Sequence, residues 1–265
     1  MTHTELLDND TSNVRRHRVL KASLQALVCA ALVISAAGEN KARATITGMP
    51  DVTITSHNNP THPVQGGVRW FMPSHHRILA RNSHDNFDVV FLGDSITEGW
   101  PHDLLNKHFG KHRPVINGIG GDRAENVLWR LNHGELDGKT PKLVVLLLGT
   151  NNSGMNTPGE MALGVGTVIQ RLTEIVPDAK ILLLGIFPVT HDGRNAKIKD
   201  ANAYLAKMHD GKRVHYMNLN TNFLDPDGNL RTDMLKDGVH LTRHGYAMWG
   251  ATTSQKVTQL VNGAE

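Results

Sequence analysis

Three residues of this sequence have the types and spacing needed for ester hydrolysis. Ser95 lies just after the apolar run 89–92, and Asp237 precedes His240 by three residues near the end of the chain. In a triad, the serine hydroxyl attacks the ester carbonyl, the imidazole accepts its proton, and the carboxylate orients the imidazole. A spacing of three residues lets one short turn hold Asp237 against His240. The pattern favours nucleophilic catalysis by Ser95.

Three groups could bind the oxyanion that forms in such a reaction. They are the backbone N–H of Ser95, the backbone N–H of Gly121 in the glycine-rich stretch 118–121, and the side-chain amide of Asn151. Amide donors stabilise negative charge without titrating. Each segment also has an ordinary structural interpretation, since serine caps helices and glycine, asparagine and aspartate form turns. The order of all the segments together favours the catalytic interpretation.

Apolar runs that alternate with helix-like stretches predict the elements that must position these residues. Runs typical of strands lie at 88–92, 114–117, 143–148, 180–185 and 214–219. Helix-like stretches lie at 74–82, 101–109, 123–131, 158–176, 195–208 and 243–261. The run 143–148 is apolar on both faces, which is typical of a parallel strand covered by helices on both sides. The pattern therefore predicts an α/β protein with three layers, α/β/α.

The polar segments follow the predicted strands, where parallel sheets place their sites. Ser95, the stretch 118–121 and Asn151 follow the first three strands, and the fifth leads through a loop to His240. We expect these loops to converge on one edge of the sheet. Two helix starts carry local signals: Thr157, followed by Pro158 and Glu160, predicts a capping box, and Thr242 can cap the last helix.

These blocks resemble those of the SGNH hydrolases, also called GDSL esterases or lipases, which are named for Ser, Gly, Asn and His. The matching residues are Ser95, Gly121, Asn151 and His240, with Asp237 as the third triad member. Over residues 70–265 the resemblance implies a flavodoxin-like α/β/α fold with a central parallel sheet. It also implies an esterase with no metal or organic cofactor.

The sequence is most similar to one branch, the catalytic subunits of platelet-activating-factor acetylhydrolase. The similarity is carried by residues 117–122, 127–131, 132–136 and 149–152. Enzymes of that branch remove a short acetyl group, and the resemblance implies that Ile96 and Val239 line the acyl pocket. The branch forms dimers, so a homodimer is one expected state of this chain.

The N-terminal segment 1–44 has the pattern of a signal peptide. Basic residues at 15–21 precede an uncharged, apolar stretch at 22–38, followed by small residues. The apolar run is short for a membrane-spanning helix. We expect cleavage between Gly38 and Thr45 and export to the periplasm or beyond, with an uncleaved anchor as the alternative. The only cysteine, Cys29, lies in this segment, so the mature protein would contain no disulfide.

The charge of the chain excludes some partners. The first 44 residues hold six of the 28 Lys and Arg and four of the 25 Asp and Glu, so the rest is nearly neutral. No basic run with interleaved aromatics is present, and we predict no nucleic-acid binding. His102, His133 and His244 lack the spacing of metal ligands, and we predict no metal site.

Two further features have structural interpretations that the sequence leaves open. Residues 45–69, rich in Asn, His, Pro and Thr, are expected to form an extended lead-in. That lead-in could cover the cleft, tether the enzyme or pack behind the sheet. Trp129 is expected to pack in the core, whereas Trp100 either borders the cleft or packs under the first helix.

The sequence therefore predicts an exported serine esterase that hydrolyses short-chain, acetyl-type esters on carbohydrates or other small substrates. One alternative is a lipid esterase, such as a lysophospholipase, a thioesterase or an enzyme like platelet-activating-factor acetylhydrolase. A second is a non-catalytic glycan-binding protein on the same fold. We expect no stable membrane insertion once the signal is removed.

Overall fold

Five parallel strands form the centre of the computed structural model, which describes residues 46–190 and 193–263. They are β1 (Val89–Gly93), β2 (Pro114–Gly118), β3 (Leu143–Leu147), β4 (Lys180–Leu184) and β5 (Val214–Met217). Their order is β2-β1-β3-β4-β5, and all neighbours are parallel. Because the chain steps from β1 to one side and later returns to the other, the order reverses between β1 and β3. Ligand sites in such sheets form at this reversal, at the carboxyl ends of the strands.

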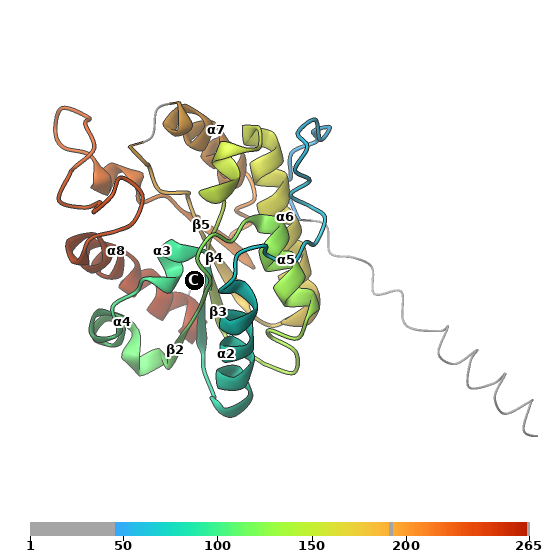
Figure 1. The fold of residues 1–265 in the computed structure, drawn as a ribbon. Helices are drawn as coiled ribbons and strands as arrows, with labels where there is room; N and C mark the ends of the chain where they lie inside the picture. Colours follow the sequence, from blue (N-terminus) through green and yellow to red (C-terminus); the bar gives the residue numbers. More distant parts are fainter. Residues whose placement is uncertain (1–45, 191–192, 264–265) are drawn as a thin grey trace, which may run out of the picture. The chain divides into compact units, whose positions relative to one another are not determined.

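Helices cover both faces of the sheet and complete the three predicted layers (Figure 1). One face carries α5 (Ala124–Asn132), α6 (Pro158–Ile175) and α7 (Arg194–Ala206), and the other carries α4 (His102–Phe109) and α8 (Arg243–Asn262). Strand residues alternate between the two cores, so that Val90 and Leu92 face α5 and α6, whereas Val89 and Phe91 face α4 and α8. Residues apolar at every position suit a strand of this kind. The remaining elements are α2 (Phe71–His84), α3 (Ser95–Glu98), η1 (Gly110–His112), η2 (Asn151–Gly154) and η3 (Asn220–Phe223).

The predicted elements are present, with ends that differ by one to three residues. One local difference lies at Ser95, where a short helix, α3, begins that the apolar pattern did not predict. The helix begins there because Asp94 Oδ1 accepts the N–H of Ile96 at 2.9 Å and caps it. Thr242 caps α8 as predicted, with its hydroxyl accepting the Gly245 N–H at 3.2 Å.

The capping box at the start of α6 also fastens the lead-in. Glu160 Oε2 accepts the Thr157 N–H at 2.9 Å, as predicted. The same carboxylate accepts the backbone N–H groups of Thr55 and Ser56, at 2.6 and 3.0 Å, and the Ser56 hydroxyl at 2.6 Å. These hydrogen bonds outweigh the effect of burial, which alone would raise the pKa of Glu160, and hold that pKa well below its usual range. A carboxylate that caps a helix therefore also docks a segment about 100 residues earlier in the chain.

The lead-in lies along α6 because three glycines of that helix leave room for it. A Cβ at Gly159 would lie 2.7 Å from Val52, and one at Gly164 would lie 2.7 Å from Pro60. At Gly166 the distance to Met49 would be 3.0 Å. Further along, Val64 exchanges backbone and side-chain hydrogen bonds with α5. Of the three roles left open for the lead-in, its contacts with α5 and α6 favour packing against a helical layer.

The predicted signal segment, its cleavage site and Cys29 lie outside the described residues. Within the part of the chain that the structure describes, no helix has both the length and the apolar character needed to cross a bilayer.

Replacing Gly164 with alanine is expected to lower the Tm. The added Cβ would lie 2.7 Å from Pro60 Cβ and 2.9 Å from Ala124 Cβ. Overpacking costs about 1–3 kcal/mol, which exceeds the gain of about 1 kcal/mol that alanine brings inside a helix. Differential scanning calorimetry measures the change, with Gly67→Ala as the control because no atom lies within 4 Å of its Cβ position. A Gly164→Ala protein that melts at or above the wild-type temperature would contradict this packing.

Candidate active site

The structure brings Ser95, His240 and Asp237 into one chain of hydrogen bonds. Ser95 Oγ lies 2.8 Å from His240 Nε2, and His240 Nδ1 lies 2.7 Å from Asp237 Oδ2. Ser95 and His240 are 145 residues apart in the sequence. A histidine placed between a hydroxyl and a carboxylate can accept the hydroxyl proton while the carboxylate fixes its tautomer. The arrangement has the geometry required for an activated serine.

The backbone of the loop that carries His240 is fixed by Asp237. Asp237 Oδ1 accepts the backbone N–H groups of Val239 and His240, at 3.1 and 2.8 Å. Gly238 adopts φ +81°, and a Cβ there would lie 1.9 Å from the hydroxyl of Thr190. The Thr190 N–H donates to the Gly238 carbonyl at 2.8 Å. Only glycine fits at this position, because a side chain would collide with Thr190 and strain the backbone.

The other predicted site residues lie around the loop that follows β2. Gly121 adopts φ +88°, a conformation that favours glycine. Asn151, in η2, donates one amide hydrogen to the Asp122 carbonyl at 2.8 Å. A primary amide has two donors, so the second remains for an oxyanion. Ser95 Cβ lies 3.8 Å from the point where a Cβ on Gly120 would stand, which puts the loop against the serine.

The two predicted acyl-pocket residues are apolar and differ in burial. Ile96 is buried in the apolar cluster that faces α4 and α8, whereas Val239 is partly buried and packs against the clusters of both faces. The Tyr246 hydroxyl donates to the Ile96 carbonyl at 2.7 Å and ties α3 to α8. Trp100 is also buried there, against Phe91 and other aromatic rings, so it packs under the helix and does not border the cleft.

A buried arginine holds the ends of β1 and β2 beneath the site. Arg130 is fully buried; its guanidinium donates to the carbonyls of Gly93 and Asn117, both at 3.3 Å. It pairs with Asp122 at 2.8 Å and with Glu135. Asn117 Nδ2 donates to Glu135 Oε1 at 3.0 Å. Sequence reasoning missed this cluster, because nothing local marks Arg130 as a buried cation.

The helix α2 is joined to this cluster. Asn82 Nδ2 donates to the Glu135 carbonyl at 2.9 Å, and Arg81 donates to Asn117 Oδ1. His75 lies 3.8 Å from Glu135, and burial together with the charge of Arg130 lowers the pKa of His75 to about 4. A histidine with so low a pKa stays neutral near pH 7, so His75 adds no further charge to the cluster.

The carboxylates of the site have different pKa values because they differ in burial. Burial raises the pKa of Asp94 to about 6, against the lowering effects of the Ile96 N–H and His240. Burial likewise raises the pKa of Asp122 to about 7, although Arg130 lowers it. Burial alone would also raise the pKa of Asp237, but the hydrogen bonds from His240 and Val239 lower it to about 2. Asp237 is therefore ionised at any pH near neutrality.

The end of the lead-in, at Val68, and the residue that starts the domain, Trp70, reach the site; covering the cleft was one of the three roles that the sequence left open. Trp70 Nε1 donates to the Gly120 carbonyl at 2.9 Å, and Val68 lies 3.9 Å from the Cβ position of Gly121. Both side chains are exposed, Trp70 by 46%. Trp129, which was expected to pack in the core, is only partly buried and packs against Phe71 in a small apolar cluster beside α2. An exposed apolar edge beside the glycine loop is suited to contact with substrate.

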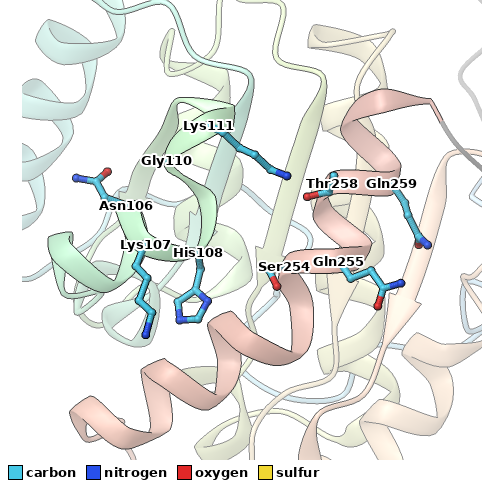
Figure 2. A pocket seen from close by; sticks show the side chains of 9 residues that line it. All are labelled: Asn106, Lys107, His108, Gly110, Lys111, Ser254, Gln255, Thr258 and Gln259. Carbon is cyan, nitrogen blue, oxygen red and sulfur yellow. The ribbon is translucent and has the colours of Figure 1, made fainter.

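Of two cavities near the surface, one borders the candidate site and the other does not. A cavity of about 600 Å³ lies between α4, η1 and the second half of α8 (Figure 2), and contains none of the predicted site residues. A cavity of about 390 Å³ is lined by Glu98 and Gly118, which adjoin Ser95 and the glycine loop. Among the described residues no group of three or more His, Cys, Asp or Glu side chains is placed to hold a metal ion.

The sequence matches the model of the GDSL-like lipase/acylhydrolase family over residues 91–248. It is 32% identical over 200 residues to the alpha1 subunit of platelet-activating factor acetylhydrolase IB from Bos taurus, a match that covers 74% of this chain and 85% of the relative. The alpha2 subunit from Bos taurus is 33% identical over 202 residues, with 75% and 87% covered. The chain belongs to the GDSL-like lipase/acylhydrolase family, the SGNH hydrolases, and is an ester-bond hydrolase.

Solved structures show the same fold. A GDSL-like lipase from Bacteroides thetaiotaomicron aligns with a TM-score of 0.61 at 21% identity, covering 70% of this chain and 97% of its own. A carbohydrate acetylesterase from Sinorhizobium meliloti aligns with a TM-score of 0.54 at 19% identity, covering 65% and 98%. The predicted three-layer α/β/α fold is confirmed.

Replacing Asp94 with asparagine is expected to change how stability depends on pH. The pKa of Asp94 rises from 3.8 to about 6 on folding, so the folded state binds more protons between these values. The free energy of unfolding therefore falls as the pH rises through this window, by up to about 3 kcal/mol from this group. Asparagine does not titrate, so the variant does not lose this stability. The Tm of the variant minus the Tm of wild type should therefore increase as the pH rises from about 4 to about 6.

Tm measurements across that range test the expectation. Asp200→Asn is the control, because Asp200 is an exposed carboxyl on α7. A difference between the Asp94→Asn variant and wild type that is the same at every pH would contradict a raised pKa for Asp94.

Proposed function

We propose that this chain is an exported serine esterase that removes short acyl groups, of the acetyl type, from carbohydrates or other small substrates. The observation that carries the catalytic part is the hydrogen-bond chain from Ser95 through His240 to Asp237, with contacts of 2.8 and 2.7 Å. A chance juxtaposition of a serine and a histidine would not be expected to include an ionised carboxylate on the second ring nitrogen.

In the proposed mechanism, Ser95 Oγ attacks the ester carbonyl while His240 Nε2 accepts its proton. The ionised Asp237 stabilises the imidazolium that results. The oxyanion accepts hydrogen bonds from the N–H groups of Ser95 and Gly121 and from the Asn151 amide. His240 then protonates the leaving alcohol, and in the second half it activates the water that hydrolyses the acyl-enzyme.

The preference for a short acyl group rests on two observations. Ile96 belongs to the packed apolar cluster of α4 and α8, and Val239, also branched and apolar, packs against that cluster and against the cluster of the opposite face. In addition, the curated relatives that share about a third of the sequence are acetylhydrolases by name. A closed apolar wall leaves room for a small acyl group and less for a long chain.

Export is proposed from the signal-like pattern of residues 1–44, and it motivates the choice of alcohol. An enzyme in the periplasm or outside the cell meets acetylated sugars and polysaccharides. The carbohydrate acetylesterase from Sinorhizobium meliloti has the same fold and acts on substrates of that class. No nucleic-acid partner, metal or organic cofactor is part of the proposal.

The proposal predicts fast hydrolysis of p-nitrophenyl acetate with rates that fall along the series to octanoate. Wild type and Ser95→Ala are assayed in parallel, and the activity is expected to disappear in the variant. If Ser95→Ala hydrolysed the esters as fast as wild type, Ser95 could not be the nucleophile. A maximum at octanoate would instead favour the lipid-esterase alternative.

Replacing Asn151 with alanine should lower kcat by about 100- to 1000-fold, the usual cost of losing one oxyanion donor. The ground-state ester carries little charge on its carbonyl oxygen, so KM should change much less than kcat. Asn152→Ala is not a suitable control, because Asn152 is buried and holds the Ala124 N–H at 3.0 Å. Asn106→Ala, an exposed asparagine of α4 in the cavity of Figure 2, serves instead. An unchanged kcat in Asn151→Ala would exclude its side chain from the oxyanion hole.

A further inference from the structure

Two arginines of α2 point to a second recognition site beside the serine. Arg77 and Arg81 are separated by one helical turn, so they lie on the same side of the helix. Both line the cavity of about 390 Å³, together with Glu98, His102 and Gly118. The cavity lies at β2, the strand that ends the sheet, between α2, α3 and α4. It therefore combines two permanent positive charges with a place at the edge of the candidate active site.

Neither guanidinium has a described carboxylate at ion-pair distance, although the negative charges of Glu135 and Asp85 act on Arg81 from farther away. In the described part of the chain, no Asp or Glu oxygen lies within 4.0 Å of Arg77 or Arg81, whereas six other arginines form such pairs: Arg113, Arg123, Arg130, Arg171, Arg231 and Arg243. Arg77 donates to the Ser74 hydroxyl at 2.7 Å. Arg81 donates to two side-chain amide oxygens, while its buried Nε has no partner among the described residues. Both side chains thus keep N–H donors for a ligand.

The cavity connects to the reacting atoms through Glu98. Its Oε2 lies 3.1 Å from the point where a Cβ on Gly120 would stand, and Ser95 Cβ lies 3.8 Å from the same point. Gly118 lies between them, with the Glu98 N–H only 2.2 Å from its Cβ position. Glu98, which lines the cavity, and Ser95 therefore lie beside the same glycine of the loop.

The surfaces on the two sides of Ser95 differ in chemistry. This difference indicates which side suits the acyl group of the ester and which suits its alcohol portion. The side with Ile96 and Val239 is apolar and packed, which suits an acyl group. The side with Arg77 and Arg81 is open and cationic, which suits the alcohol portion. Guanidinium groups bind carboxylates and phosphates through paired N–H donors.

We propose that this cavity binds an anionic group, a carboxylate or a phosphate, on the alcohol portion of the ester substrate, through Arg77 and Arg81. The inference rests on the proposed esterase function and narrows its substrates to acetylated, negatively charged molecules. Glu98 lies at the serine end of the cavity. Its carboxylate repels an anion there and so favours the far end, at α2.

The test compares three acetate esters: 4-acetoxyphenyl phosphate, 4-acetoxybenzoate and the neutral phenyl acetate. Arg77→Gln should lower kcat/KM for an anionic ester about tenfold, mainly through KM, the order expected when one charge-assisted contact is lost. It should leave kcat/KM for phenyl acetate within about twofold of wild type, because no charge of that ester needs Arg77. Arg77 is the better variant, since Arg81 also contacts Asn117 below the site.

Lys107→Gln is the matched control. It removes the same charge from the cavity of Figure 2, which holds none of the predicted site residues. It should change none of the three rates by more than about twofold, as expected of a distant, screened surface charge. Glu98→Gln should act in the opposite direction and raise kcat/KM for the anionic esters, because it removes a repulsive charge.

The pattern across esters decides the outcome and the source of the anion. A loss in Arg77→Gln on the phosphate alone identifies a phosphorylated alcohol, and a loss on the benzoate alone identifies a carboxylated one. An equal loss on all three esters, or no loss on either anionic ester, overturns the proposal.

Absence of hydrolysis of every ester by wild type would overturn the esterase function, and a second readout then tests the cavity. Calorimetric binding of phenyl phosphate to Ser95→Ala should weaken about tenfold when Arg77→Gln is added, the same charge-assisted contact being lost, and unchanged binding would overturn the anion site.

Discussion

The pairing of Arg130 with Asp122 and Glu135 is the interaction on which the geometry of the site depends. The side chains of all three are buried, and the guanidinium also binds the carbonyls at the ends of β1 and β2. Removing one partner of such a cluster leaves a buried charge unpaired, which costs about 3–5 kcal/mol. Ser95 follows the end of β1 and the glycine loop follows the end of β2. The cluster therefore ties the segments that carry Ser95 and the glycine loop to the same buried guanidinium below the sheet edge.

A second constraint is steric and explains why the loop consists of glycines. A Cβ at Gly118 would lie 2.2 Å from the Glu98 N–H, and one at Gly120 would lie among Glu98, Trp70 and Ser95. Gly121 must also adopt a positive φ. The loop backbone can approach α3 only without side chains. This approach places the loop against Ser95, and the Asp122 carbonyl at its end accepts from Asn151.

The sequence predicted the parts of this protein that depend on local patterns. The strands follow from short runs that are apolar on both faces, and the caps at Thr157 and Thr242 follow from side chains within three residues of their partners. The site residues could be listed because each follows a strand, but the role of Trp70 could not. Its partner, the Gly120 carbonyl, is 50 residues away, and Glu160 binds Ser56 over 104 residues. Contacts of that kind depend on the tertiary fold, and a single sequence carries no local signal for them. The short helix at Ser95 was missed because the flanking glycines indicated a turn.

The proposed function assigns chemistry and recognition to different segments. Ser95, Asp237 and His240 are held by backbone hydrogen bonds within α3 and the turn at 237–240, and by α8 through Tyr246. The surfaces around them, Trp70, Val68 and the arginines of α2, belong to the lead-in and the helix that follows it. That region is attached to the domain by Glu160, by the glycines of α6 and by Asn82. A substitution on the outer face of α2, away from Asn82, can change which alcohol is bound, because none of the described hydrogen bonds of the triad comes from that helix. In the proposed function, the lead-in and α2 are thus the parts of the chain in which the choice of alcohol can change at the least cost to the reaction.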